Sequence, residues 1–143
     1  CLLEVNKLEQ IATNSNDERL LAFALSMKAR AQDGLGDFEK AIKNVLEAAR
    51  IQEQVDSRSL GNTYSQIAMT YAHMKQPELA TPWFQKSLVQ ARKDRNTRFE
   101  VNALNNMASH YHTLKKTDSS TYYYGELLKR EAQLNPFQKM GTY

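Results

Sequence analysis

Three alanines recur at a nearly constant spacing along this chain. Ala29, Ala68 and Ala108 each lie in the middle of a helical pattern, and they are 39 and then 40 residues apart. Each is followed twelve residues later by a small side chain and four residues after that by a large apolar one: Ala41, Ala80 and Ser120, then Val45, Phe84 and Tyr124. A repeat of this length is typical of a chain that folds as a stack of similar units. Since such a stack offers a long surface rather than an enclosed cleft, the spacing favours a binding protein.

Composition fits a single helical domain. The chain has 143 residues, of which 41% are hydrophobic, with only five glycines and three prolines. The net charge of +3 is mild, and the basic residues gather at Arg92, Lys93, Arg95 and Arg98. Cations near the end of a helix suit its dipole, so we interpret this cluster as a solvated helix end. No nucleic-acid-binding motif accompanies the charge, and we therefore expect no direct binding of nucleic acid.

The sequence carries no motif for catalysis, metal binding or membrane insertion. His110 and His112 are two residues apart on one helix, which points them roughly 200° apart, and His73 lies at the end of another helix. A phosphate-binding glycine loop, a nucleophile motif and zinc-ligand spacing are missing, and no apolar run is long enough to span a bilayer. We expect a non-enzyme without cofactor or metal, soluble and with the cytoplasm as the favoured compartment.

Breaks in the apolar periodicity predict seven helices. Pro77 suits the first position of the fifth helix, while Pro82 lies inside it and implies a late start or a kink. The expected ranges are about 2–12, 17–34, 37–54, 57–75, 77–93 and 97–114, then a last helix that ends before Pro136. The tail from Phe137 to Tyr143 shows no periodicity, and we expect it to be frayed.

Polar residues before these helices are candidate caps. Ser15 with Glu18 and Thr97 with Glu100 both have the spacing of a capping box, in which each side chain accepts a hydrogen bond from a free backbone N–H. We expect Asp56 or Ser57 to cap the fourth helix, and Asp118 to cap the seventh. Of the tyrosines at 122–124, the repeat position predicts that only Tyr124 packs inside.

The repeated positions resemble the tetratricopeptide repeat, a helix–turn–helix unit of 34 residues. The second repeat has Tyr64, Ile67, Ala68, Tyr71, Ala80, Phe84 and Ser87; the third has Leu104, Met107, Ala108, Tyr111, Ser120, Tyr124 and Leu127. The first has Leu25, Lys28, Ala29, Gln32, Ala41, Val45 and Ala48, of which Lys28 and Gln32 depart from the family pattern. The resemblance covers about residues 17–134. Its longer period is similar to the extended variant of kinesin light chains and of bacterial regulators.

The resemblance implies an all-α, right-handed α-solenoid of antiparallel helix pairs. We expect one solenoid over residues 1–135, with a half repeat at 1–14, full repeats at about 15–55, 56–95 and 96–135, and a tail at 136–143. Extending the period backwards places Cys1 opposite Ala41, so we favour a packed Cys1 over the lipid-anchored cysteine of a bacterial lipoprotein. Leu2, Val5 and Leu8 are expected to form an apolar outer face. That face indicates that repeats are missing and makes the half repeat a candidate surface for self-association.

The resemblance also implies a concave groove lined by the first helix of each repeat. The expected peptide-binding residues are Asn62, Ser65, Met69, His73, Asn102, Asn105, Ser109 and His112, and the first repeat contributes Phe23, Ser26, Arg30, Asp33 and Gly34. An asparagine amide both donates and accepts hydrogen bonds, which suits the backbone of an extended peptide. Only Arg30 is cationic among these positions, so the two-carboxylate clamp of some family members is not expected here. The opposing interpretation is that these polar side chains are merely solvated.

Two functional hypotheses follow. The first is a non-catalytic module that holds a protein or a peptide, as a segment of a larger protein. The second is the sensor part of a bacterial signalling or transcriptional regulator, whose effector domain lies outside this chain. The two differ in what flanks residue 143, so the full-length gene product would separate them.

Overall fold

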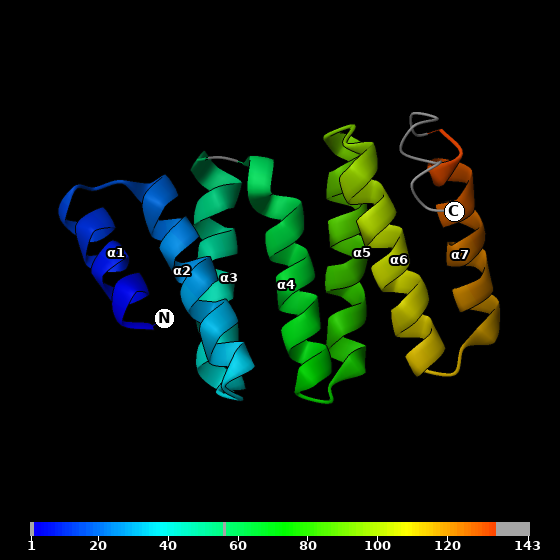
Figure 1. Cartoon of the computed structure of the whole chain (residues 1–143), viewed down its shortest axis with the longest axis horizontal. Coiled ribbons are helices and arrows are strands. Elements are labelled where there is room, and N and C mark those ends of the chain that lie inside the picture. The colour runs from blue at the N-terminus through cyan, green and yellow to red at the C-terminus, as the bar shows by residue number, and fades with distance from the viewer. Residues whose placement is uncertain (1, 56, 134–143) are drawn as a thin grey trace.

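The computed structural model describes residues 2–55 and 57–133, and these residues form helices joined by short turns (Figure 1). Cys1, Asp56 and the tail lie outside the described residues, and so do the expectations made for them. Within the described ranges there are seven α-helices, one 3-10 helix and no β-strand. Their bounds are α1 Leu2–Asn14, α2 Glu18–Gly34, α3 Phe38–Val55, η1 Ser57–Ser59, α4 Leu60–His73, α5 Pro77–Lys93, α6 Thr97–Thr113 and α7 Thr117–Glu131.

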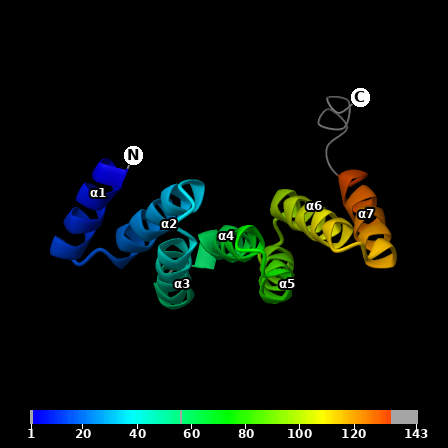
Figure 2. The ribbon, with the colours of Figure 1, turned by 90° about the horizontal axis from the view of Figure 1, so that it is seen from below.

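The helices stack as antiparallel pairs in chain order. Helices α2 and α3, α4 and α5, and α6 and α7 form three hairpins (Figures 1 and 2). Helix α1 packs against α2 at the N-terminal end of the array. Figure 2 shows that α2, α4 and α6 follow one side of the array, while α3 and α5 follow the other. Each hairpin packs mainly on its neighbours in the chain. The predicted all-α helical repeat is therefore confirmed.

The small residues that recur with the period lie where paired helices meet. Ala29, Ala68 and Ala108 are fully buried. Ala41 and Ala80 are fully buried as well, and the Ser120 hydroxyl donates a hydrogen bond of 3.0 Å to the backbone carbonyl of Ala108. Because a small side chain lets two helix backbones approach closely, the alanine period marks the contact inside each pair.

Five of the connections between helices share one backbone geometry. In each, the middle of three linking residues has a positive φ: Asn16, Gly36, Lys75, Arg95 and Lys115. After α4, for example, the N–H of Lys75 donates to the carbonyl of Ala72, and the N–H of Gln76 donates to that of Tyr71. This pair of hydrogen bonds is the Schellman motif, which satisfies the last carbonyls of a helix. The link between α3 and α4 differs, because the 3-10 helix η1 lies within it.

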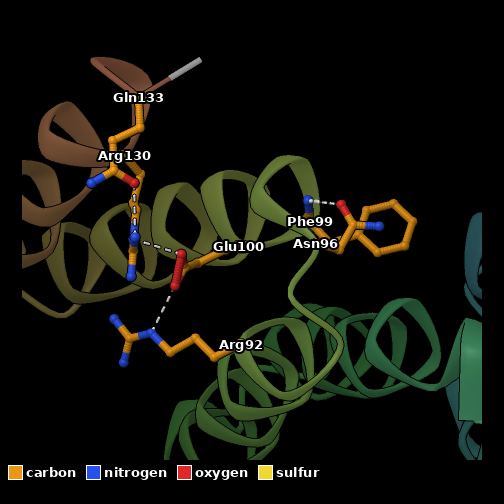
Figure 3. Close-up of polar contacts among 6 residues, drawn as sticks. All are labelled: Arg92, Asn96, Phe99, Glu100, Arg130 and Gln133. Carbon is orange, nitrogen blue, oxygen red and sulfur yellow. Dashed lines mark hydrogen bonds and ion pairs between the residues drawn. The ribbon is translucent and has the colours of Figure 1, made fainter. Parts of the chain in front are cut away.

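The predicted caps at α2, α6 and α7 are wrong, and so is Ser57 as the cap of α4. At α2 the carboxylate of Asp17 accepts a hydrogen bond from the backbone N–H of Leu20. At α6 the side-chain oxygen Oδ1 of Asn96 accepts one from the backbone N–H of Phe99 (Figure 3). Helix α4 starts only at Leu60, after η1, and α7 starts at Thr117, before the expected cap. At α6 the predicted and actual caps, Thr97 and Asn96, are adjacent polar residues, and the point where the backbone enters the helix selects between them. Pro82 lies inside α5, which starts at Pro77 as predicted, so the late start is excluded.

Glu100 is a buried carboxylate that joins three helices. It lies on α6 and is only 5% exposed, yet its predicted capping role is wrong. Figure 3 shows its two oxygens between two arginines: Oε1 lies 2.9 Å from Nε of Arg92 on α5, and Oε2 lies 2.7 Å from Nε of Arg130 on α7. The guanidinium of Arg130 also donates to the side-chain oxygen of Gln133. This ion-pair cluster ties the third hairpin to the second.

Both end helices expose apolar side chains. On α1, Val5 is buried against the array, so the predicted outer face is wrong at this residue, and Leu3 and Ile11 are the exposed ones. Self-association through this helix stays a prediction. On α7, Tyr124 is 42% exposed, whereas the equivalent Phe84 is buried, because α6 covers Phe84 and no described helix covers Tyr124.

The packed tyrosine of α7 is Tyr123 instead of Tyr124. Its ring stacks on that of Tyr111 at a centroid distance of 5.5 Å and an angle of 5°. The prediction that only Tyr124 packs inside is therefore wrong. Position 123 faces the first helix of its own hairpin, a contact that the end of the array does not remove.

Candidate functional site

The side of the array formed by α2, α4 and α6 carries two adjoining hollows. The first, which we call the amide hollow, has a volume of about 280 Å³ and lies between α4 and α6. Its walls include Asn62 and Ser65 from α4 and Asn102, Asn105 and Asn106 from α6. Among the described residues, no charged side chain lines it. The structure thus brings together four of the residues predicted for the groove, and Asn106 in addition.

Three of these amides are not used by the fold. Asn62, Asn102 and Asn105 are exposed, and within the described part of the chain none of their side chains forms a hydrogen bond. Asn106 differs, because its amide donates a 3.0 Å hydrogen bond to the hydroxyl of Ser65. Each free amide offers two donor hydrogens and an acceptor oxygen to a ligand.

The other predicted groove residues lie farther along the same helices. Met69 on α4 is 45% exposed, and Ser109 and His112 on α6 are exposed, but none of the three lines the amide hollow. His73, at the end of α4, is held by Asp33 of α2, with Nδ1 2.9 Å from Oδ1. These four positions extend the groove face toward the C-terminal ends of α4 and α6.

Polar bridges between neighbouring first helices were not predicted from the sequence. The amide of Gln66 on α4 donates 2.9 Å to the backbone carbonyl of Ser26 on α2, as Asn106 bridges α6 to α4. Gln66 and Asn106 are 40 residues apart, one period of the repeat. A search for amides that recur at the period would have found them. These bridges fix the spacing of the groove walls and leave the other amides free.

The second hollow, which we call the arginine hollow, has a volume of about 220 Å³ and lies between α2 and α4. Arg19, Phe23, Met27 and Arg30 from α2 line it, and Asn62 contributes to both hollows. Among the described residues its lining holds two arginines, so this end of the groove has a second cation beside Arg30, the one cation expected from the repeat positions. Arg19 and Met27 do not occupy the groove positions that the family pattern implies, which explains why they were missed.

His110 is a buried histidine behind the groove rather than part of it. Its Nε2 lies 2.7 Å from the hydroxyl of Thr81, which donates to the carbonyl of Pro77, so we assign the imidazole proton to Nε2. Burial lowers the pKa of His110 below its ordinary 6.5, and the charge of Lys116 acts in the same direction. The folded protein therefore favours the neutral ring.

The lowered pKa of His110 predicts a loss of stability in weak acid. Because the pKa of this ring is lower in the folded state, the unfolded chain binds more protons once the pH falls below 6.5. The free energy of unfolding should fall as pH drops from about 7 to about 5.5. Urea unfolding at both pH values should show a smaller drop for His110→Gln than for wild type. His112→Gln, an exposed change on the same helix, should keep the wild-type drop; equal drops in all three proteins would contradict the assignment.

Residues 2–55 and 57–133 contain neither a cluster of metal ligands nor a helix suited to cross a membrane. No group of three or more His, Cys, Asp or Glu residues there is arranged to hold a metal ion. Nor does any helix in these ranges combine the length and the apolar character that crossing a bilayer requires.

Several solved structures share this architecture at low sequence identity. The chain is similar to BtubC (BKLC) from P. vanneervenii, with a TM-score of 0.75 and 18% identity, over 84% of this chain and 49% of that one. It is also similar to the apo form of RapI, with a TM-score of 0.64 and 19% identity, over 93% and 62%. A third is a putative kinesin light chain of Podosopora anserina with nearly identical TPR-like repeats, with a TM-score of 0.72 and 17% identity, over 92% and 68%.

These likenesses concern the fold, and the chain spans about half to two thirds of the length of the first two structures. No curated protein sequence matches it. Two family models for the tetratricopeptide repeat match the chain itself, one over residues 59–130 and the other over residues 24–55. Together with the alanine period and the helix hairpins, these matches show that the chain belongs to the tetratricopeptide repeat family.

Proposed function

We propose that this chain is a non-catalytic module that binds an extended peptide segment of another protein across the face of α2, α4 and α6. The tetratricopeptide repeat is in general a protein-interaction unit, and its proteins are generally non-catalytic scaffolds. The observation that carries the proposal is the set of free amides at Asn62, Asn102 and Asn105 in an uncharged hollow. Solvated polar side chains alone would not need to gather in a concavity between two repeats.

Peptide backbone is the ligand that fits this chemistry. An extended strand presents alternating N–H and carbonyl groups about every 3.3 Å, and an amide side chain pairs with both. Asn102 and Asn105 are three residues apart on α6 and so share a face of that helix. Asn62 faces them from α4. A segment lying in the amide hollow would therefore meet amides from both walls.

The double change Asn102→Ala with Asn105→Ala is expected to weaken a genuine partner by about 5- to 150-fold, because each lost hydrogen bond removes about 0.5–1.5 kcal/mol. The fold should tolerate the change within about 0.5 kcal/mol per site, since both side chains are exposed. Partners captured with the wild-type protein would be identified, and their affinity measured by calorimetry.

Asn6→Ala with Gln10→Ala is the matched control, because these exposed amides lie on α1, away from the groove. This variant should bind as wild type does. A partner that binds the α6 double variant with unchanged affinity would rule out the amide hollow as its site.

A further inference from the structure

We infer that the arginine hollow is a specificity subsite, which accepts a large apolar side chain of the bound peptide together with a nearby side-chain carboxylate. This inference rests on the proposed function, because it assigns the kind of peptide that the groove selects. The amide hollow recognises backbone, which every peptide has. Discrimination between peptides must therefore come from another part of the same face.

The arginine hollow exposes apolar surface. Phe23 is 54% exposed and Met27 is 40% exposed, and both line the hollow from α2. Val55, at the end of α3, adds apolar surface from a second helix. An aromatic ring and a flexible thioether at the edge of a concavity suit an apolar side chain of varied shape.

Arg30 gives the arginine hollow a positive charge. Arg30 is exposed and lies one helical turn from Met27, on the same face of α2. In the described part of the chain Arg30 forms no ion pair and no hydrogen bond through its side chain. Arg19 lines the same hollow, and the unpaired charge there is that of Arg30. A carboxylate from the ligand would complement this charge, and a guanidinium can hold it through two parallel hydrogen bonds.

The wall of the arginine hollow contains an unsatisfied polar atom. The hydroxyl oxygen of Ser26, which lies between Phe23 and Arg30 along α2, is buried and has no hydrogen-bond partner. Among the buried side-chain nitrogen and oxygen atoms of the described residues it is the one without a partner. A polar group of the ligand, reached by rotation of this short side chain, would satisfy it.

The geometry also sets the spacing of the two ligand groups. Phe23 and Arg30 are seven residues apart, which corresponds to about 10 Å along α2. This length equals about three residues of an extended peptide. Since Asn62 lines both hollows, a peptide in the arginine hollow continues directly into the amide hollow. The inferred ligand has an apolar residue, an acidic residue within about three positions of it, and an extended segment beside them.

The test uses a phage-displayed library of random peptides of about twelve residues, long enough to cross both hollows in extended form. Selection on the wild-type protein should enrich peptides with a large apolar residue and an Asp or Glu within about three positions. For an enriched peptide made synthetically, fluorescence polarisation should show a loss of at least about tenfold with Arg30→Glu, since hydrogen bonds to charged groups are the stronger class. Phe23→Ala should cause a loss of about the same size.

Two controls make the result specific. Lys43→Glu reverses an exposed charge on α3, outside the groove, and should leave the affinity unchanged. Changing the acidic residue of the peptide to lysine should abolish binding to wild type and restore it to Arg30→Glu. Restoration by charge exchange would not occur if Arg30→Glu merely damaged the fold.

The outcomes separate this inference from the proposed function. Enriched peptides that require Asn102 and Asn105 but lack the acidic residue, or that bind Arg30→Glu as tightly as wild type, would overturn the inference and leave peptide binding in the groove intact. Enrichment of no peptide, or only of peptides indifferent to Asn102, Asn105 and Arg30, would overturn both.

Discussion

Replacing Arg92 and Arg130 together with methionine is expected to destabilise the protein by about 3–5 kcal/mol, the usual result of leaving a buried charge without its partner. The carboxylate of Glu100 is only 6% exposed, and these two arginines are the cations that the structure places on its oxygens. The side chains of Arg92 and Arg130 are 45% and 39% exposed, so water solvates part of their charge. The buried carboxylate of Glu100 depends far more on the two arginines than they depend on it. Urea unfolding followed by circular dichroism would measure the change.

A third substitution distinguishes charge from packing in this experiment. Adding Glu100→Leu to the double variant removes the stranded charge, and most of the lost stability should return, because an apolar replacement of a buried ion pair is often neutral or stabilising. Arg98→Met with Lys93→Met removes two exposed cations from the same region and should change stability little. If the Arg92 and Arg130 double variant matched this control, Glu100 would not depend on its arginines.

Leu104→Ala is expected to cost about 2–5 kcal/mol, the range for truncating a large buried aliphatic side chain. Leu104 is fully buried and belongs, with Phe84, Leu88 and Met107, to the core cluster that joins the second and third hairpins. Since neighbouring side chains only partly fill the space left, the loss combines burial and cavity terms. Urea unfolding and the melting temperature would both report it.

Leu128→Ala serves as the matched control for this truncation. It removes the same atoms from α7, where the side chain is 65% exposed, and should change stability by no more than about 0.5 kcal/mol. Similar losses for the two variants would mean that the α5–α6 interface is not the main core of this part of the chain.

The contacts inside each hairpin were predictable because their cause is local and repeated. Only a small residue fits where paired helices approach, so Ala68 and Ala108 mark the register in the sequence alone. The caps were less predictable, since adjacent residues such as Asn96 and Thr97 can both accept a backbone hydrogen bond, and the exact helix start decides between them. Glu100 was misassigned because Arg130, its partner on α7, is thirty residues away in the chain.

Part of the groove was predictable because its residues recur with the repeat. Asn62, Asn102 and Asn105 follow from the repeat positions, and the structure places them together. The arginine hollow was not predictable in this way, since its lining includes the end of α3 and the start of α4, and the connection between these helices differs from the other turns. Met27 lines the same hollow. Its place there depends on how two hairpins pack together, which a pattern within one repeat does not specify.

The repeated turns have a mechanical consequence for the whole array. Five connections are closed by the same two backbone hydrogen bonds, so each of them holds the two helices that it joins at a fixed angle. The link between α3 and α4 runs instead through the 3-10 helix η1. Val55 and Ser59 lie at either end of that link and also line the arginine hollow. The arginine hollow is therefore built partly on this link, whereas the amide hollow spans the α5–α6 connection, whose two backbone hydrogen bonds hold its width.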